Sequence, residues 1–230
     1  MKKALLLATL VASLLVATPQ GAFAGQVTLH PSGFGSHSYA SWKADTGLKD
    51  NVGNKDQALY FQKQTATEAF AAGVAVFNGV SGMDTSEIDP LGFYYRVDGW
   101  CGAGAPRFNL RYQPTVGPAQ TLFFGCNSGM VPTGGTLTHE GRTFHERTTV
   151  GPLPAGTVIS LSIVFDEGTT AGGLPLGPGR TWLDNIRVGD RLWTSASDNG
   201  NGGTTTANTP VTTAEMVEIL GEPLTVAFGS

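Results

Sequence analysis

Basic side chains are few and scattered in this chain of 230 residues. Its 14 lysines and arginines face 18 aspartates and glutamates, and no stretch of the sequence gathers the basic residues together. A protein that binds nucleic acid or an anionic membrane carries the opposite balance, with basic residues clustered on one face. The composition therefore argues against nucleic acid as a partner.

Two motifs of hydrolytic enzymes are missing as well. No Gly-x-Ser-x-Gly occurs, so a nucleophile elbow has no support. Two His-Glu pairs lie between residues 139 and 146, but Thr143 stands where a zinc-protease HExxH helix needs its second histidine. We predict a hairpin that turns at Glu140 and Gly141 and sets two pairs opposite each other, Thr136 with His145 and Leu137 with Phe144. A metal-binding or catalytic histidine is the alternative.

No apolar run is long enough to span a bilayer. The one from Ala4 to Val16 follows Lys2 and Lys3 and precedes Ala22-Phe23-Ala24, an A-x-A cleavage site. These features predict a signal peptide over residues 1–24, with a non-cleaved anchor as the alternative. The mature chain would carry 12 basic and 18 acidic residues, a net charge of −6. We expect it to be secreted to the cell envelope or beyond, without a transmembrane segment.

Glycine and proline, in contrast, are abundant. The chain has 32 glycines and 13 prolines, nearly a fifth of its residues against an average of about 12%. They separate short runs with strand character, which are Gln57–Gln64, Phe70–Val80, Arg142–Val150, Gly156–Phe165 and Thr181–Val188, with shorter ones at Gln26–His30 and Arg191–Thr194. Eight to ten strands in about 180 residues predict an all-β fold, a two-sheet antiparallel β-sandwich (jelly roll) over residues 25–194.

The end of the chain has a different composition. Residues 195–211 are rich in Ser, Gly, Asn and Thr and predict a flexible linker. Thr212 and Glu215 then form a capping box that opens Met216–Leu220, and Gly221 stops this run. Residues 212–230 are therefore predicted to contain a short helix and a tail. Because so short a helix is marginal alone, we expect it to dock on the sandwich or on a partner.

The only two cysteines flank a segment with three further strand patterns. The runs 92–98, 107–112 and 120–126 predict an antiparallel meander, in which the end of the first strand, the start of the second and the end of the third share one rim. Cys101 and Cys126 fall on that rim, and an exported protein meets an oxidising compartment. We predict a disulfide that closes a loop of about 25 residues. Two buried free thiols are the alternative.

Strand alternation within the meander also predicts a polar patch. If the apolar faces of its first two strands point to one core, the opposite faces present Tyr94, Arg96, Asp98, Arg107, Asn109 and Arg111, with Trp100 at the rim. A pyranose offers hydroxyl edges and an apolar C–H face, so its recognition needs planar hydrogen-bonding groups beside an aromatic ring. The patch is therefore a candidate saccharide site. An ordinary solvated sheet face is the alternative.

Two loops contain several acidic residues. Asp45 to Asp56 resembles a calcium loop in composition, but Val52 breaks the EF-hand order, and side-chain hydrogen bonds within turns explain its Asp and Asn residues. Ser81 to Asp89 carries three acids that would need a facing carboxylate to cleave a glycoside. We expect both loops to be solvated turns.

The run Arg180-Thr-Trp-Leu-Asp-Asn-Ile-Arg-Val188 resembles the last core strand of secreted jelly-roll modules, namely carbohydrate-binding, galactose-binding-like and concanavalin-like sandwiches. The resemblance implies that Asp184 helps to hold a structural calcium; no other cofactor is required. Asp184 shares its alternation face with Trp182, Ile186 and Val188, so a buried hydrogen-bonded aspartate is an equal alternative. Cys101 to Phe108, with Gly125-Cys126, resembles a segment of secreted bacterial β-sandwich proteins of no assigned function, which implies the disulfide and no activity.

These observations favour a secreted, non-catalytic β-sandwich that binds a glycan or another extracellular polymer. A polysaccharide hydrolase or lyase on the same scaffold would require facing carboxylates, and no motif proposes them. A structural or adhesion protein without a small ligand is the third hypothesis. The oligomeric state is left open. Saccharide binding at the polar patch needs a face that is open to solvent rather than covered by the loop from Gly33 to Asp56.

Overall fold

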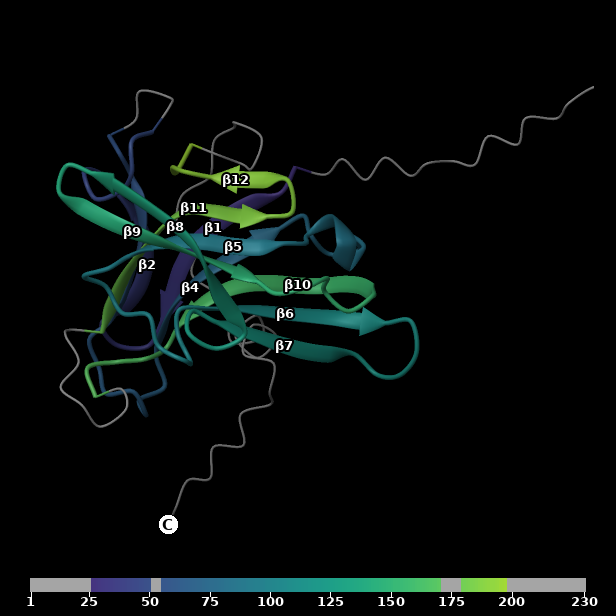
Figure 1. Ribbon diagram of the computed structural model, residues 1–230. Coiled ribbons are helices and arrows are strands. Elements are labelled where there is room, and N and C mark those ends of the chain that lie inside the picture. The colour runs from purple at the N-terminus through teal and green to yellow at the C-terminus, as the bar shows by residue number, and fades with distance from the viewer. Residues whose placement is uncertain (1–25, 51–54, 171–178, 198–230) are drawn as a thin grey trace, which may run out of the picture.

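The computed structural model describes residues 26–50, 55–170 and 179–197, which form two antiparallel β-sheets packed as a sandwich (Figure 1). The five-stranded sheet contains, in spatial order, β1 (Thr28–Phe34), β4 (Ala72–Asn78), β10 (Gly156–Phe165), β6 (Arg107–Pro114) and β7 (Gln120–Gly125). The seven-stranded sheet contains β2 (Ser38–Lys43), β3 (Ala58–Lys63), β11 (Arg180–Val188), β5 (Leu91–Arg96), β9 (Arg142–Thr149) and β8 (Met130–His139), with β12 (Arg191–Trp193) paired to β11. The expected all-β sandwich is thus confirmed.

Most strand positions follow the alternation and turn signals of the sequence. The predicted and observed bounds of β10 coincide, and those of β3, β4, β9, β11 and β12 agree to within two residues. The first strand begins two residues later than predicted and runs on to Phe34, and β2 was not predicted.

A 3₁₀ helix (Thr85–Glu87) occupies the second acidic loop, where the Asp84 and Glu87 carboxylates accept backbone N–H groups as a capping box. Two of the three acids of that loop therefore have a structural role.

The facing sides of the two sheets form one apolar core. It contains Phe93 from β5, Phe108 from β6 and Leu183 from β11, together with Trp193 from β12. Phe93 and Phe108 come from opposite sheets, and their ring centroids lie 5.7 Å apart. Each sheet therefore has an inner face that packs in this core and an outer face that points away from it.

The three predicted strands of the meander do not lie in one sheet, so the prediction is wrong for the first of them. β6 and β7 form the expected hairpin, with Arg107 opposite Gly125, but β5 pairs with β9 and β11 in the other sheet. The ten residues between Arg96 and Arg107 include three glycines and a proline, and such a connection is long enough to cross the roughly 10 Å between packed sheets. The chain therefore changes sheets after β5.

The disulfide prediction is confirmed despite that change. Cys101 and Cys126 are bonded, with their Cα atoms 5.3 Å apart. Cys101 lies in the connection that crosses between the sheets, and Cys126 follows β7 directly. The bond thus links the segment that leaves the seven-stranded sheet after β5 to the end of β7 in the five-stranded sheet. The prediction had placed both cysteines on the rim of a single sheet.

The hairpin of β8 and β9 has the predicted register. Thr136 lies opposite His145 and Leu137 opposite Phe144. Glu140 and Gly141 both have positive φ angles, 47° and 77°, as the two central residues of a type I′ turn require.

Bulges shift the alternation in two strands. In β10 the register shifts between Val158 and Ser160, so Val158 enters the core and Ile159 does not. In β11 it shifts between Asp184 and Arg187, where Asn185 has a φ of 44°. Trp182 and Asp184 therefore lie on the outer side, whereas Ile186 and Val188 point into the core. The shared face predicted for these four residues is wrong.

The domain continues slightly beyond the predicted boundary at residue 194. Ser195 is buried, and the amide of Ala196 donates to Oε1 of Gln57 at 2.8 Å. These residues thus belong to the sandwich rather than to the predicted linker.

The signal peptide, residues 198–211 of the linker and the predicted helix and tail lie outside the described residues. Within the part of the chain that is described, no helix is long and apolar enough to cross a membrane.

Candidate functional site

The residues of the predicted polar patch lie on two opposite outer faces. One group, on or beside the outer face of the seven-stranded sheet, consists of Tyr94, Arg96 and Asp98. The other group, on the outer face of the five-stranded sheet, consists of Arg107, Asn109 and Arg111. Because β5 and β6 belong to different sheets, their outward side chains point in opposite directions. The prediction of one continuous surface is therefore wrong.

Arg96 is covered where it lies. Its guanidinium stacks on the Trp182 ring, 3.5 Å from the centroid, and donates to both carboxylate oxygens of Asp98 at 2.5 and 3.0 Å. A third bond reaches the carbonyl of Thr46 at 3.4 Å, in the loop that crosses this face. Only 11% of the Arg96 side chain is exposed. The loop between β2 and β3 thus covers this part of the predicted patch.

The same face carries a row of aromatic rings that the sequence analysis did not identify. Tyr60 lies between Tyr39 and Trp182, with ring centroids 5.8 and 5.1 Å away. The Lys43 ammonium sits 3.7 Å from the Tyr60 centroid and Arg96 occupies a face of Trp182. These rings already stack with cations of the protein, so they provide little free aromatic surface for a sugar.

Tyr94 is similarly enclosed. Burial raises the pKa of its phenol, and the nearby Glu146 carboxylate acts in the same direction. Tyr94 lies opposite Glu146 on β9 and opposite Asp184 on β11. It is thus held between two acidic neighbours of its own sheet.

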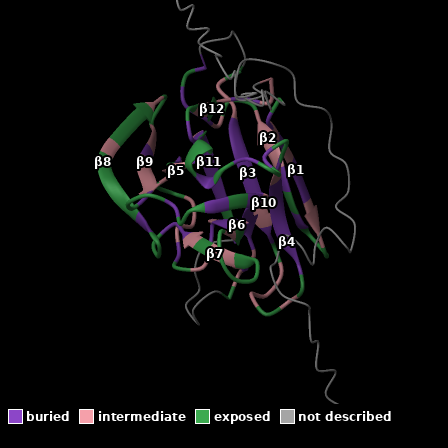
Figure 2. Ribbon diagram, turned by 90° about the vertical axis from the view of Figure 1, so that its right-hand side faces the viewer, coloured by how far each residue is buried: buried purple, intermediate pink, exposed green. Residues whose placement is uncertain are grey.

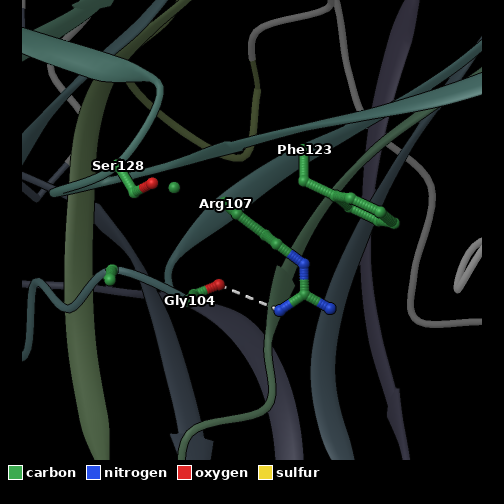
Figure 3. Close-up of a pocket in the computed structure, with 6 residues that line it drawn as sticks. Gly104, Arg107, Phe123 and Ser128 are labelled. Atoms are coloured by element: carbon green, nitrogen blue, oxygen red, sulfur yellow. Dashed lines mark hydrogen bonds between the residues drawn. The ribbon is translucent and has the colours of Figure 1, made fainter.

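Arg107 is the centre of the other group. It donates from Nη1 and Nη2 to the two carboxylate oxygens of Asp166 at 2.6 and 2.7 Å, and from Nε to Oδ1 of Asn109 at 2.9 Å. Nη1 also donates to the carbonyl of Gly104 at 2.9 Å (Figure 3). A planar cation with four such bonds is held in one orientation.

A hollow of about 280 Å³ lies beside this arginine. Its lining residues come from the connection after β5, from β6, from β7 and from the turn after β7, and they are Ala103, Gly104, Arg107, Phe123, Gly125 and Ser128. The Phe123 side chain is half exposed, and its ring centroid is 5.6 Å from the Arg107 guanidinium (Figure 3). The hollow thus combines an exposed aromatic ring with a fixed planar donor group.

Asp166, Phe123 and Ser128 were missed from the sequence. Phe123 stands in the run Leu122-Phe123-Phe124, where alternation alone does not tell which ring faces outward. Pairing with β6 decides it, because Phe123 lies opposite Asn109, an outward residue. Arg111 also points outward from β6. It lies opposite Thr121 of β7, two residues beyond the pair of Asn109 and Phe123.

Trp100 lies beside the hollow but does not line it. Its indole Nε1–H donates to Oε2 of Glu167, and the amide of Gly104 donates to Oε1 at 3.0 Å. A Cβ atom on Gly104 would lie 2.6 Å from Oε1, so the glycine allows this close approach. Burial raises the pKa of Glu167 above its ordinary value of 4.5, and the Gly104 hydrogen bond opposes that shift. Trp100 and Glu167 thus fix the connection that forms one wall of the hollow.

Asp184 is fully buried and hydrogen bonded. Its Oδ2 accepts the Leu48 amide at 2.6 Å and its Oδ1 accepts the Asn185 amide at 2.7 Å. The Leu48 bond anchors the loop between β2 and β3 to the seven-stranded sheet, and the Asn185 bond lies within β11. They support the alternative of a structural hydrogen-bonded aspartate; they do not test the calcium that the family resemblance implies.

A group of potential metal ligands lies elsewhere, at the tip of the β8–β9 hairpin. His139 Nε2 is 2.7 Å from Oδ2 of Asp56 and 4.0 Å from Oε1 of Glu140. The Arg142 guanidinium donates to Glu140 at 2.8 Å and places a positive charge against the group. Asp56 Oδ1 also accepts the Asp50 amide at 3.2 Å, so this carboxylate serves the predicted turn of the loop. The arrangement is a hydrogen-bonded contact between hairpin and loop, and it gives His139 a partner that the sequence analysis did not foresee.

Comparison with known proteins adds no further residue to these sites. No family model, curated protein or solved structure matches the chain. The functional assignment therefore rests on the geometry of the hollow beside Arg107.

Proposed function

We propose that this protein is a secreted, non-catalytic binding module that takes a saccharide unit of an extracellular polymer in the hollow beside Arg107. The proposal rests on one observation, the exposed Phe123 ring beside a guanidinium fixed by Asp166, Asn109 and Gly104. A volume of about 280 Å³ is close to the lower end of small-molecule sites, roughly 300 Å³. It suits one sugar ring of a chain whose remaining units lie outside the hollow.

The chemistry of the lining favours an uncharged sugar. Phe123 offers a ring for the apolar C–H face, and Ser128 and the second lone pair of the Gly104 carbonyl offer hydrogen bonds to hydroxyls. The charge of Arg107 is already balanced by Asp166 in a two-bond pair. An anionic sugar would have to compete with that pair, whereas a neutral sugar would not.

Binding is favoured over hydrolysis because none of the residues that line the hollow is acidic. Two acids bond to lining residues. Asp166 is paired with Arg107, and the two oxygens of Glu167 accept hydrogen bonds from Trp100 and Gly104. A glycosidase needs two carboxyl groups that flank the scissile bond. The hollow therefore offers contacts to a sugar without the groups that would cleave it.

The test compares two arginines that have the same local chemistry on opposite faces. Arg107 and Arg96 each form a two-bond pair with an aspartate and are 14% and 11% exposed. Affinity gel electrophoresis on β-glucan, xylan and galactan, with alginate as an anionic comparison, would measure retention of the parent chain and both variants. R107A should weaken retention on a neutral polymer about tenfold, the effect of losing about 1.4 kcal/mol of hydrogen bonding. R96A should leave it unchanged.

A second pair of variants tests the aromatic contact. Phe123 and Phe70 are each 50% exposed, but only Phe123 lines the hollow. F123A should lower retention and F70A should not. Equal retention of R107A, R96A and the parent would exclude this site, and a parent retained by none of the polymers would favour a structural or adhesion protein instead.

A further inference from the structure

The outer face of the five-stranded sheet carries an apolar patch in its middle. Ala72 and Val74 of β4 and Val164 of β10 form it, and Val74 lies directly opposite Val164. All three are 0% exposed, although they point away from the core that the two sheets enclose. We call these three residues the outer patch.

Burial extends from the outer patch across four strands. Neighbouring outward residues of β1, β10 and β6 are also buried, namely Ser32, Ser162 and Asn109. β4 is buried along almost its whole length (Figure 2). The outward face of an antiparallel sheet that meets water has exposed side chains. Short side chains with no exposed area in the middle of such a face require a further layer above them.

Side chains of the same face shelter only the margins of the outer patch. Among the described hydrophobic side chains, Phe34 of β1 and Val76 of β4 pack on the patch, and the Phe34 ring lies tilted against Phe70 at a centroid distance of 4.9 Å. Arg107 lies opposite Val164, but its guanidinium is directed to Asp166 and Phe123. Because these exposed fractions belong to the single chain, a further segment of the same chain must complete the cover.

The chain contains a segment with the right pattern. Residues 198–230 follow the last described residue, and within them the predicted helix after Thr212 has its apolar residues on one side, namely Met216, Val217, Ile219 and Leu220. Glu215 and Glu218 fall on the opposite side. A helix of two turns is not stable alone in water, so such a stripe needs a surface to pack on.

The segment can reach the outer patch. Trp193 packs against Phe77 of β4 with ring centroids 5.2 Å apart, so the chain leaves the described domain next to the five-stranded sheet. Residues 198–211 supply 14 residues of linker, which span up to roughly 46 Å when extended. Crossing the whole sheet takes about 20 Å.

We propose that residues 212–220 form an amphipathic helix that packs its apolar side on the outer patch of its own chain. The helix makes a third layer on the five-stranded sheet and is tied to the domain by a linker rich in Gly, Ser, Asn and Thr. This inference is independent of saccharide binding, because the hollow lies at β6 and β7 and the outer patch at β4 and β10.

Hydrogen exchange on the mature full-length chain tests whether the segment is folded. Amides of 216–220 should exchange at least about tenfold more slowly than those of 199–209, which have no helix pattern. V217D/L220D should abolish that protection and increase binding of an apolar dye, whereas E215Q/E218Q on the acidic side should preserve both. Protection that is equal in 216–220 and 199–209 of the parent would overturn the proposal.

A cysteine pair tests where the segment lies. In the full-length chain, V74C/V217C should form a second, intramolecular disulfide under mild oxidation, because contact across the outer patch brings the two Cα atoms within about 7 Å. The control L137C/V217C places one cysteine on β8 of the other sheet and should not cross-link. A disulfide-linked dimer from the first pair, at low protein concentration, would show that a second copy covers the patch. That result, or no cross-link at all, would contradict the proposal.

Discussion

Cys101 and Cys126 join the two sheets of the sandwich at the hollow, with 5.3 Å between their Cα atoms. The connection after Cys101 supplies Ala103 and Gly104 to one wall, and Gly125 and Ser128 on either side of Cys126 supply another. A Cβ atom on Gly125 would clash with the Ala103 carbonyl, so the two walls are in direct contact. The disulfide therefore fixes the candidate site as well as the loop of 25 residues that it closes.

Removal of that disulfide should lower stability substantially. For a loop of this length, chain-entropy models give about 3 kcal/mol. We expect C101A/C126A to lose about that much free energy of unfolding, measured by guanidinium chloride denaturation of the oxidised parent and the variant. The reduced parent should behave like the variant. A difference below about 0.5 kcal/mol would mean that the connection is held by Trp100 and Glu167 rather than by the bond.

Strand positions were predictable because they depend on local patterns. Gly156–Phe165 has the composition and bounds of a core strand, and the Glu140-Gly141 turn fixed the register of its hairpin. The sheet to which β5 belongs was not predictable. Its residues alternate in the same way beside β6 or beside β9, and only packing of the whole core chooses between them.

Only the part of the candidate site that lies on one strand could be predicted, because alternation along a strand is a local pattern. Arg107 and Asn109 were found from the alternation of one strand, which is a local property. Asp166 and Ser128 come from distant parts of the chain, and their meeting depends on the sheet order. The bulge at Asp184 divided the expected face of β11 between the two sides of the sheet, because an inserted residue shifts parity without a clear sequence signal.

Lys63 should be important for the loop between β3 and β4. Its side chain is almost fully buried, and its ammonium donates to the carbonyls of Thr67 and Ala69, both at 2.7 Å. K63M would leave two carbonyls without these donors, and we expect a loss of about 1–3 kcal/mol in chemical denaturation. K49M, which changes an exposed lysine, is the control and should be neutral.

The pH dependence of that difference has a definite sign. Burial lowers the pKa of Lys63 below its ordinary value of 10.5, so the folded chain releases this proton at lower pH than the unfolded chain does. The stability of the parent relative to K63M should therefore increase as pH rises through the lowered pKa toward 10.5. If the relative stability falls over that range, the hydrogen bonds to the ammonium stabilise its charged form by more than burial destabilises it.

The contact between Asp56 and His139 should make the β8–β9 hairpin sensitive to acid. The hydrogen bond from His139 is the largest of the causes that hold the pKa of Asp56 below its ordinary value of 3.8. A carboxyl group with a lowered pKa stabilises the fold above its unfolded pKa and loses that effect as pH falls through the folded pKa. D56N should therefore melt below the parent at pH 6, and the two melting temperatures should converge below pH 3.8. D45N, in the same loop, should follow the parent throughout.

Asp184 should hold the loop between β2 and β3 through hydrogen bonds rather than through a metal. D184A would leave the Leu48 and Asn185 amides without their acceptor, and each buried unsatisfied group costs about 1–3 kcal/mol. We expect D184A to be destabilised by at least about 2 kcal/mol, with faster hydrogen exchange at Leu48 and Gly47 than in the core strands. Melting curves of the parent with EDTA and with millimolar calcium should coincide. If calcium raises the melting temperature of the parent but not of D184N, the carboxylate is a metal ligand, as the jelly-roll resemblance of β11 implies, and the hydrogen-bond account is incomplete.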